Sequence, residues 1–255
     1  MAINTNQKLA VLIDADNAQA SVIQELLAEV SRYGTATIKR AYGDWTTTNL
    51  KSWKEVLHTM AIQPIQQFAY TSGKNATDSA LIIDAMDVLH ADSVDGFCLV
   101  SSDSDFTRLA TRIREAGLVV YGFGQRKTPE PFVAACDKFI YTEILRSEPG
   151  MAKVATASSG TSAAHFLEVA ALPDLKSMVL IAIDAVARDD GWAPLGPVGG
   201  LINKNNPSFD PRNYGFSQLS KLMRKQEYLD VKEVPMGDGS TNVHFYVRQK
   251  VGTVR

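Results

Sequence analysis

The chain has few residues of the kinds that form disulfides or bind soft metals. Its 255 residues include two cysteines and four histidines, which are scattered along the sequence. Cys98 and Cys136 both lie in apolar runs, so we expect reduced core thiols there rather than a disulfide or a zinc site. Such cysteine usage favours a reducing, cytoplasmic compartment. The composition therefore argues against a disulfide scaffold and against a site built from Cys or His.

Long hydrophobic runs and a strong net charge are also absent from the sequence. Residues 1–8 lack a signal-peptide hydrophobic region, and no apolar run approaches membrane-spanning length. We therefore expect no membrane partner. The formal net charge of -2 gives no global signature of nucleic-acid binding. A polyanion would have to be met by local basic patches or through metal ions.

What the first part of the chain does contain is an alternation of short apolar runs with helical patterns. This alternation predicts an α/β fold with a mostly parallel sheet that helices cover on both faces. Pro64 predicts that the third strand lies at an edge of the sheet. The expected strands are residues 9–13, 35–43, 62–70, 97–100 and 118–124, and the expected helices are residues 18–30, 49–60, 78–89 and 107–116.

Acidic side chains follow the first and fourth of these strands. Asp14 ends the first strand, and Asp103 and Asp105 come directly after the fourth. If the sheet is doubly wound, these two strand ends are neighbours, and Asp78 at the start of a helix can reach the same crevice. Carboxylates brought together repel one another unless they take up protons or a cation. Because only oxygen ligands are offered, Mg²⁺ or Mn²⁺ fits best, and such a site suits hydrolysis of a phosphodiester.

Simpler roles for these residues stay open. Asp is a good helix N-cap, so the Asp-x-Asp pair could serve only as a cap. Asp84 lies on a different helical face from Asp78, which favours a peripheral or structural role. Lys74 could steady a phosphate or simply be exposed. Asp14 could also be the nucleophile of a phosphatase, but such enzymes usually have a small hydroxyl residue where this chain has Asn17-Ala18.

The composition changes after about residue 147 to Ser, Thr, Ala and Gly, which is typical of a flexible linker. Acidic side chains outnumber basic ones before this change, and basic side chains outnumber acidic ones after it. We therefore expect a first domain at residues 1–147, a linker at 148–168 and a second domain at 169–250.

The second domain reads as three short helices followed by a two-stranded wing, which is a winged-helix pattern. The helices are expected at residues 174–188, 199–205 and 216–226, and the strands at 228–234 and 243–248. Basic side chains gather near the last helix and are candidates for phosphate contacts, although a basic helix face is often only a solvated one. They are Arg212, Lys221, Arg224 and Lys225.

Three motifs of the first domain resemble the NYN family of PIN-like nucleases, and most of all its bacterial LabA-like branch. They are Asp14-Ala15-Asp16-Asn17, Lys74-Asn75-Ala76-Thr77-Asp78 and Ser101-Ser102-Asp103-Ser104-Asp105-Phe106. The resemblance covers about residues 8–145 and implies a PIN-like fold with RNA as the substrate. It also implies a divalent ion held by Asp14, Asp78, Asp103 and Asp105, with Asn17 supporting the first-strand position. We expect Ser102 and Lys74 to be further supporting residues. The family commonly has glycine at the positions of Ser102 and Asn75.

The second domain resembles the OST-HTH or LOTUS domain over about residues 172–248. Two runs carry the resemblance, Asp190-Gly191-Trp192-Ala193-Pro194-Leu195 and Phe209-Asp210-Pro211-Arg212-Asn213-Tyr214-Gly215-Phe216. The resemblance implies a winged helix that takes part in RNA binding. We expect its aromatic residues Trp192, Tyr214 and Phe216 to pack in the core.

Together these observations favour a Mg²⁺- or Mn²⁺-dependent endoribonuclease with a C-terminal RNA-binding module. The alternative is a catalytically weak RNA-binding or regulatory protein on a nuclease-like scaffold. The sequence is compatible with single-stranded and with structured RNA, and the resemblance to PIN-like domains allows a homodimer.

Overall fold

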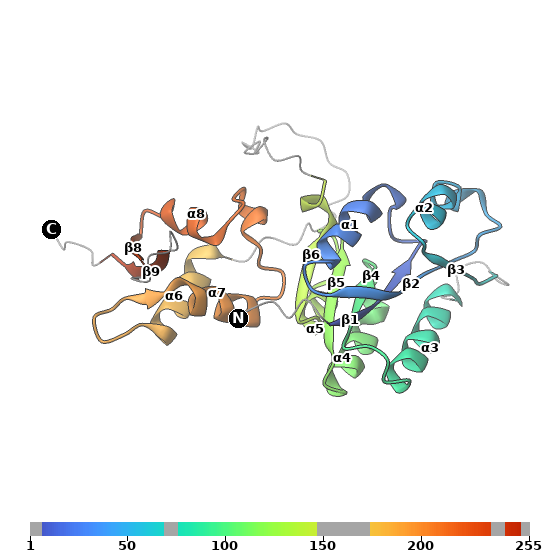
Figure 1. Ribbon diagram of the computed structural model, residues 1–255, viewed down its shortest axis with the longest axis horizontal. Coiled ribbons are helices and arrows are strands. Elements are labelled where there is room, and N and C mark those ends of the chain that lie inside the picture. The colour runs from blue at the N-terminus through green and yellow to red at the C-terminus, as the bar shows by residue number, and fades with distance from the viewer. Residues whose placement is uncertain (1–6, 69–75, 147–173, 236–242, 251–255) are drawn as a thin grey trace, which may run out of the picture. The chain divides into compact units, whose positions relative to one another are not determined.

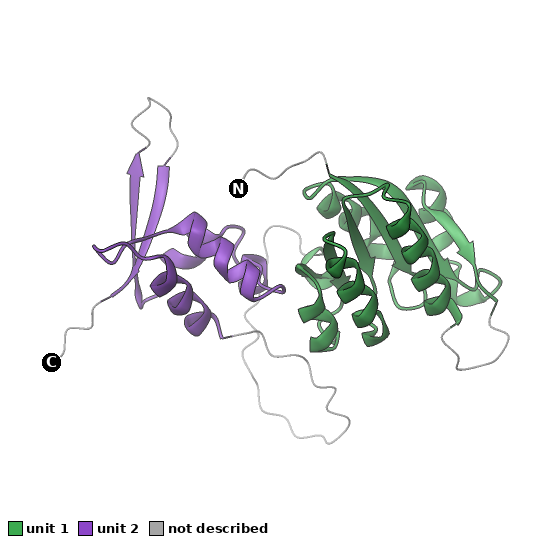
Figure 2. Cartoon of the chain, turned by 90° about the horizontal axis from the view of Figure 1, so that it is seen from below, with its two compact units in different colours: residues 1–170 green, residues 171–255 purple. Residues whose placement is uncertain are grey.

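The computed structural model describes residues 7–68, 76–146, 174–235 and 243–250. The chain divides into two compact units, Met1–Ala170 and Ala171–Arg255 (Figure 2). The expected linker at 148–168, the loop with Lys74 and the turn of the expected hairpin lie outside the described residues. Among the described helices, none combines the length and the apolar character that crossing a bilayer requires.

The first unit is built on a six-stranded sheet in which every neighbouring pair is parallel. Its strand order, β3-β2-β1-β4-β5-β6, reverses between β1 and β4, as expected for a doubly wound sheet. Pro64 lies in the edge strand β3, as its missing N–H predicts. The strands are β1 (Lys8–Asp14), β2 (Thr35–Gly43), β3 (Gln63–Gln66), β4 (Gly96–Val100), β5 (Val119–Gly124) and β6 (Lys138–Tyr141).

Helices cover both faces of this sheet (Figure 1). One core packs Leu12 of β1 and Leu99 of β4 against helices α3 (Ala76–His90), α4 (Thr107–Glu115) and α5 (Glu130–Ala135). The other packs Val11 and Cys98 against α1 (Ile23–Val30) and α2 (Trp53–Thr59). Because neighbouring residues of a strand face opposite sides, the apolar runs of β1 and β4 serve both cores. The expected α/β fold is therefore confirmed, and Cys98 and Cys136 are buried free thiols.

The sequence patterns predicted neither helix α5 nor the last strand of the sheet, β6. Both are short, and short apolar runs do not show a clear period of either helix or strand. The tertiary structure places β6 beside β5, where Phe139 packs over Gly122. An ideal Cβ on Gly122 would lie 2.7 Å from Cys136 Sγ and would also overlap the Phe139 ring. A glycine at this position is therefore what allows β6 to complete the sheet.

The second unit is a winged helix with its own core. Asp174 caps its first helix by accepting the N–H groups of Lys176 and Ser177 through its carboxylate. The helices pack against an antiparallel sheet of order β7-β9-β8. The elements are α6 (Leu175–Val186), β7 (Ala193–Pro194), α7 (Leu195–Asn205), α8 (Leu219–Arg224), β8 (Leu229–Pro235) and β9 (Val243–Gln249).

Of the three aromatic residues expected in this core, two pack against it. Tyr214 and Phe216 contact the core cluster as partly buried side chains. Trp192 does not, because the next residue, Ala193, faces the core and is fully buried. Successive side chains of an extended segment point to opposite sides, so Trp192 lies on the outer side of the sheet. The expectation of a core role for Trp192 was therefore wrong.

We expect Gly122→Ala to lower the free energy of unfolding of the first unit by about 1–3 kcal/mol, because the added methyl group overpacks the contact between β5 and β6. Urea unfolding followed by tryptophan fluorescence would measure the change. Gly200→Ala in α7 is a matched control, since an added Cβ there meets no atom within 4 Å. An unchanged stability of the Gly122→Ala protein would contradict the packing described here.

Candidate functional site

The carboxylate of Asp14 lies buried at the carboxyl end of β1, where the sheet order reverses. Its side chain is 0% exposed. Asn17 Nδ2 donates a hydrogen bond of 2.8 Å to Asp14 Oδ2, and Asn17 N donates a longer one of 3.3 Å to Oδ1. Burial raises the pKa of Asp14 above its ordinary value, whereas the hydrogen bonds from Ser101 and Asn17 lower it. Asn17 therefore contacts the Asp14 carboxylate through both its side chain and its backbone N–H.

Ser101 connects the ends of β1 and β4. Its hydroxyl donates to Asp14 Oδ2 at 2.7 Å and accepts the N–H of Asp103 at 3.1 Å. The position of the turn after β4 therefore depends on the carboxylate at the end of β1. Ser101 was not among the site residues predicted from the sequence. Its place directly after a buried strand and two residues before Asp103 was the signal that could have found it.

Three carboxylates converge at this edge of the sheet. One oxygen each of Asp78, Asp103 and Asp105 lies within 4.8 Å of the others. Asp78 comes from the first turn of α3, while Asp103 and Asp105 come from the turn that follows β4. This cluster does not include the Asp14 carboxylate, which lies close enough to Asp78 to raise its pKa. The structure thus gathers the four predicted acids in one region but distinguishes Asp14 from the other three.

The pKa of Asp78 reflects the repulsion between these carboxylates. Partial burial is the largest cause, and repulsion by Asp14, Asp103 and Asp105 follows, so that the pKa of Asp78 rises to about 6. Asp16, which the sequence analysis named only as part of a motif, adds to the same repulsion. A site of this kind favours the uptake of a proton or a cation.

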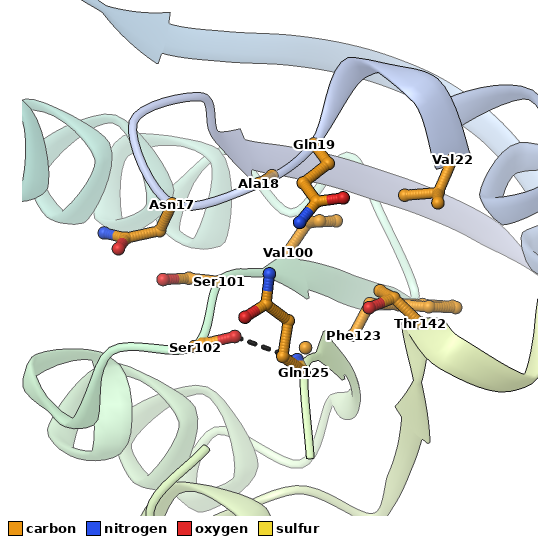
Figure 3. A pocket seen from close by; sticks show the side chains of 11 residues that line it. Asn17, Ala18, Gln19, Val22, Val100, Ser101, Ser102, Phe123, Gln125 and Thr142 are labelled. Atoms are coloured by element: carbon orange, nitrogen blue, oxygen red, sulfur yellow. Dashed lines mark hydrogen bonds between the residues drawn. The ribbon is translucent and has the colours of Figure 1, made fainter. Parts of the chain in front are cut away.

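Asp103 also acts as a helix cap, the simpler role that the sequence left open. Its Oδ1 accepts the N–H of Asp105 at 2.9 Å at the start of the short 3-10 turn Ser104–Phe106. Capping uses one carboxylate oxygen of Asp103 and does not account for the convergence with Asp78. Ser102 has a separate role, since its Oγ accepts the N–H of Gln125 at 2.9 Å (Figure 3).

Helix α3 is tied to the sheet on another face. Asp84 accepts hydrogen bonds from Arg40 and Tyr42 of β2, and the Arg40 contact is an ion pair. Burial raises the pKa of Tyr42, which keeps its hydroxyl protonated as a donor. Because Tyr42 pairs with Asp14 in the sheet register, this contact fixes α3 next to the acidic site. A structural role for Asp84, as the helical spacing favoured, agrees with these contacts.

A small cavity adjoins the acids between the ends of β1, β4 and β5 (Figure 3). Asn17, Gln19, Ser101 and Gln125 contribute polar side chains to its lining. Its volume of about 10 Å³ is enough for about one water molecule. The cavity therefore does not accommodate a nucleobase, whereas Asp105 of the acidic cluster is exposed.

The basic residues predicted to contact RNA differ in their surroundings. Arg212 forms a two-point ion pair with Asp210, with Nε–Oδ1 and Nη2–Oδ2 distances of 3.0 and 2.8 Å. Arg224 forms an ion pair with Glu233. Lys221 and Lys225 are exposed, and Lys221 Nζ lies 3.3 Å from Ser217 Oγ. Carboxylates thus hold both arginines of the predicted set.

The first unit and part of the second match two family models. The model of the NYN domain matches residues 8–145, and the model of the OST-HTH/LOTUS domain matches residues 171–241. No curated protein matches the chain.

Three solved structures are similar to parts of the chain. A protein of unknown function from Vibrio parahaemolyticus is 18% identical, with 55% of this chain and 94% of that chain covered and a TM-score of 0.45. A solution structure of residues 175–257 of a Chromobacterium violaceum protein is 39% identical, with 33% and 88% covered and a TM-score of 0.27. An uncharacterized protein from Nitrosomonas europaea is 31% identical, with 42% and 91% covered and a TM-score of 0.27.

We expect the Asp78 carboxyl group to titrate near pH 6 in the metal-free protein, and Asp103→Asn to lower that pKa because it removes a like charge. Carboxyl ¹³C chemical shifts against pH would measure both values. Since the folded-state pKa lies above the ordinary 3.8, the stability that protonated Asp78 contributes is present below pH 3.8 and lost as pH rises through about 6. Asp87→Asn, a change of an exposed acid on the same helix, is the control. An Asp78 pKa that does not respond to Asp103→Asn would contradict the proximity of the two groups.

Proposed function

Because the chain belongs to the NYN domain family and carries an OST-HTH/LOTUS domain, we propose that it is a metal-dependent endoribonuclease. The observation that carries the proposal is the convergence of Asp78, Asp103 and Asp105 beside the buried Asp14. The proposal assigns residues 1–147 to the nuclease domain, 148–168 to a linker and 169–250 to an RNA-binding domain.

The donor set of the site fits a hard divalent cation. Its three converging groups are all carboxylates, and in the described part of the chain this is the one such group of possible ligands. Mg²⁺ and Mn²⁺ prefer oxygen ligands, and a cation relieves the repulsion that raises the pKa of Asp78. We propose that Asp78, Asp103 and Asp105 hold the ion and that Asp14 is the fourth acid of the metal site. When bound, such an ion supplies an activated water and stabilises charge on the phosphate.

The residues around the acids would keep this arrangement rigid. Ser101 and Asn17 hold the Asp14 carboxylate, and Ser101 also positions the backbone of Asp103. Ser102 fixes the neighbouring turn through Gln125. Preorganised charge of this kind lowers the cost of binding a phosphodiester in a reactive position. We also propose that Lys74, from the motif that ends at Asp78, helps to neutralise the phosphate of the substrate.

A phosphatase that uses Asp14 as its nucleophile is less compatible with the geometry. The Asp14 side chain is fully buried, and its Oδ2 already accepts hydrogen bonds from Ser101 and Asn17. A nucleophile must meet its substrate within about 3–3.5 Å, which this burial prevents. The alternative of an RNA-binding protein without turnover remains an outcome of the experiment below.

We expect Asp103→Asn to reduce metal-dependent RNA cleavage roughly 10³-fold. Metal-ion catalysis contributes several kcal/mol, and 1.36 kcal/mol corresponds to tenfold in rate. The assay is cleavage of end-labelled single-stranded and structured RNA with Mn²⁺, Mg²⁺ or EDTA. Asn is also a good N-cap, so the turn after β4 should keep its fold, which urea unfolding would check.

Asp87→Asn removes the same charge from an exposed position on α3 and should leave cleavage unchanged. Full activity of the Asp103→Asn protein, or equal activity in EDTA, would rule out the proposed site. Binding of RNA without cleavage by the unaltered protein would instead support the regulatory alternative.

A further inference from the structure

The outer side of the sheet in the second unit carries a cluster of cations and aromatic rings, which we call the wing face. It consists of Arg188, Trp192, Lys232, Tyr246 and Arg248. Lys232 pairs with Tyr246 in the register of β8 and β9, so the two side chains share one side of the sheet. The opposite side meets the core through Leu229, Ala193 and Val247, which are 4%, 0% and 0% exposed.

The five side chains form a continuous row of contacts. Lys232 Nζ lies 4.1 Å and Arg248 Cζ 4.6 Å from the centre of the Trp192 ring. Lys232 Nζ and Arg188 Cζ lie 5.4 and 5.2 Å from the centre of the Tyr246 ring. Each distance is within the range of a cation–π interaction. Three positive groups are therefore held in place around two partly exposed rings.

Carboxylates neutralise only part of this positive charge. Asp230 Oδ2 pairs with Arg248 at 3.1 Å. Within the described part of the chain, no carboxylate lies at ion-pair distance from Arg188 or Lys232. The turn after Arg188 holds Asp189 and Asp190, of which Asp190 accepts the N–H of Trp192 at 3.1 Å. By contrast, carboxylates hold both arginines of the set predicted to bind RNA, Arg212 in the turn Pro211–Tyr214 and Arg224 at the end of α8.

The contacts alone could serve only to stabilise the wing. An exposed cation–π pair contributes about 0.5–1 kcal/mol, which explains a single contact. It does not explain why three like charges share one face, because their mutual repulsion opposes the gain. An anionic partner that covers the face would remove this repulsion.

We propose that the wing face binds single-stranded RNA, an assignment that rests on the function proposed above. Single strands bind proteins through phosphates on Lys and Arg and through bases stacked on aromatic rings or guanidinium planes. The wing face offers both kinds of group side by side. Cations held over rings also lose less freedom on binding than free side chains do. The phosphates then contact Arg188 and Lys232, and bases stack beside Trp192 and Tyr246.

The test compares RNA binding by full-length proteins that all carry Asp103→Asn and are kept in EDTA. The probe is a fluorescein-labelled oligouridine, titrated at several salt concentrations. We expect Arg188→Gln/Lys232→Gln to weaken binding and to reduce the slope of log K against log salt by about 1.4, since each lost phosphate contact on a single strand is worth about 0.7. A matched control, Lys176→Gln/Lys204→Gln, removes the same charge and one cation–ring contact, that of Lys176 with Tyr228. This control should leave the slope unchanged.

A second comparison, Lys221→Gln/Lys225→Gln, tests the basic residues of α8. Loss of binding in this protein, with normal binding by the wing-face variant, would overturn the proposal in favour of α8. The proposal would also be overturned if poly-glutamate displaced the labelled oligouridine as effectively as unlabelled oligouridine does, because a peptide offers no base to stack. Urea unfolding shows whether each variant is folded, and Lys232→Arg alone, which keeps the charge, should bind as the reference protein does.

The proposal and the function on which it rests fail in different ways. If the unaltered protein cleaves RNA with Mn²⁺ or Mg²⁺ but the wing-face variant binds normally, only the wing-face proposal fails. If the unaltered protein cleaves no RNA under any condition, the nuclease assignment fails. Absence of oligouridine binding by the reference protein overturns the wing-face proposal, whatever the cleavage assay shows.

Discussion

The hydrogen bond from Ser101 Oγ to the buried Asp14 carboxylate joins the two halves of the first unit's sheet. It links the ends of β1 and β4, the strands between which the order of the sheet reverses. Through the same hydroxyl, the turn that carries Asp103 and Asp105 takes its position. The candidate site therefore depends on one serine that bridges two strands, and both strands are anchored in two hydrophobic cores.

Both units bring side chains of like charge close together, but different contacts keep the two clusters in place. In the first, four carboxylates gather at one sheet edge, and the contact of Asp84 with β2 keeps α3 beside them despite the repulsion. In the second, aromatic rings hold three cations on the wing face. Among the residues that the structure describes, each arrangement lacks a full set of counter-charges, which is the physical reason to expect a cation at the one and a polyanion at the other.

Much of the fold could be predicted because its signals are local. A continuous apolar run such as Leu9–Ile13, followed by Asp14, indicates a buried strand and a polar turn, and Pro64 correctly indicated an edge strand. Helix α5 and strand β6 were missed because runs of this length do not separate helix from strand by period. Residues 138–141 form a strand only because they pair with β5, where the missing side chain of Gly122 leaves room for Phe139.

The sequence by itself determined which groups could do chemistry: Asp14, Asp78, Asp103 and Asp105 recur at strand and helix ends, and doubly wound topology brings such ends together. The tertiary structure decided how they meet, with three carboxylates converging and Asp14 buried behind hydrogen bonds. It also decided that Trp192 faces outward and that Asp210 and Glu233 hold the arginines near α8. Burial and ion pairing depend on neighbours distant in sequence, so only the folded chain determines them.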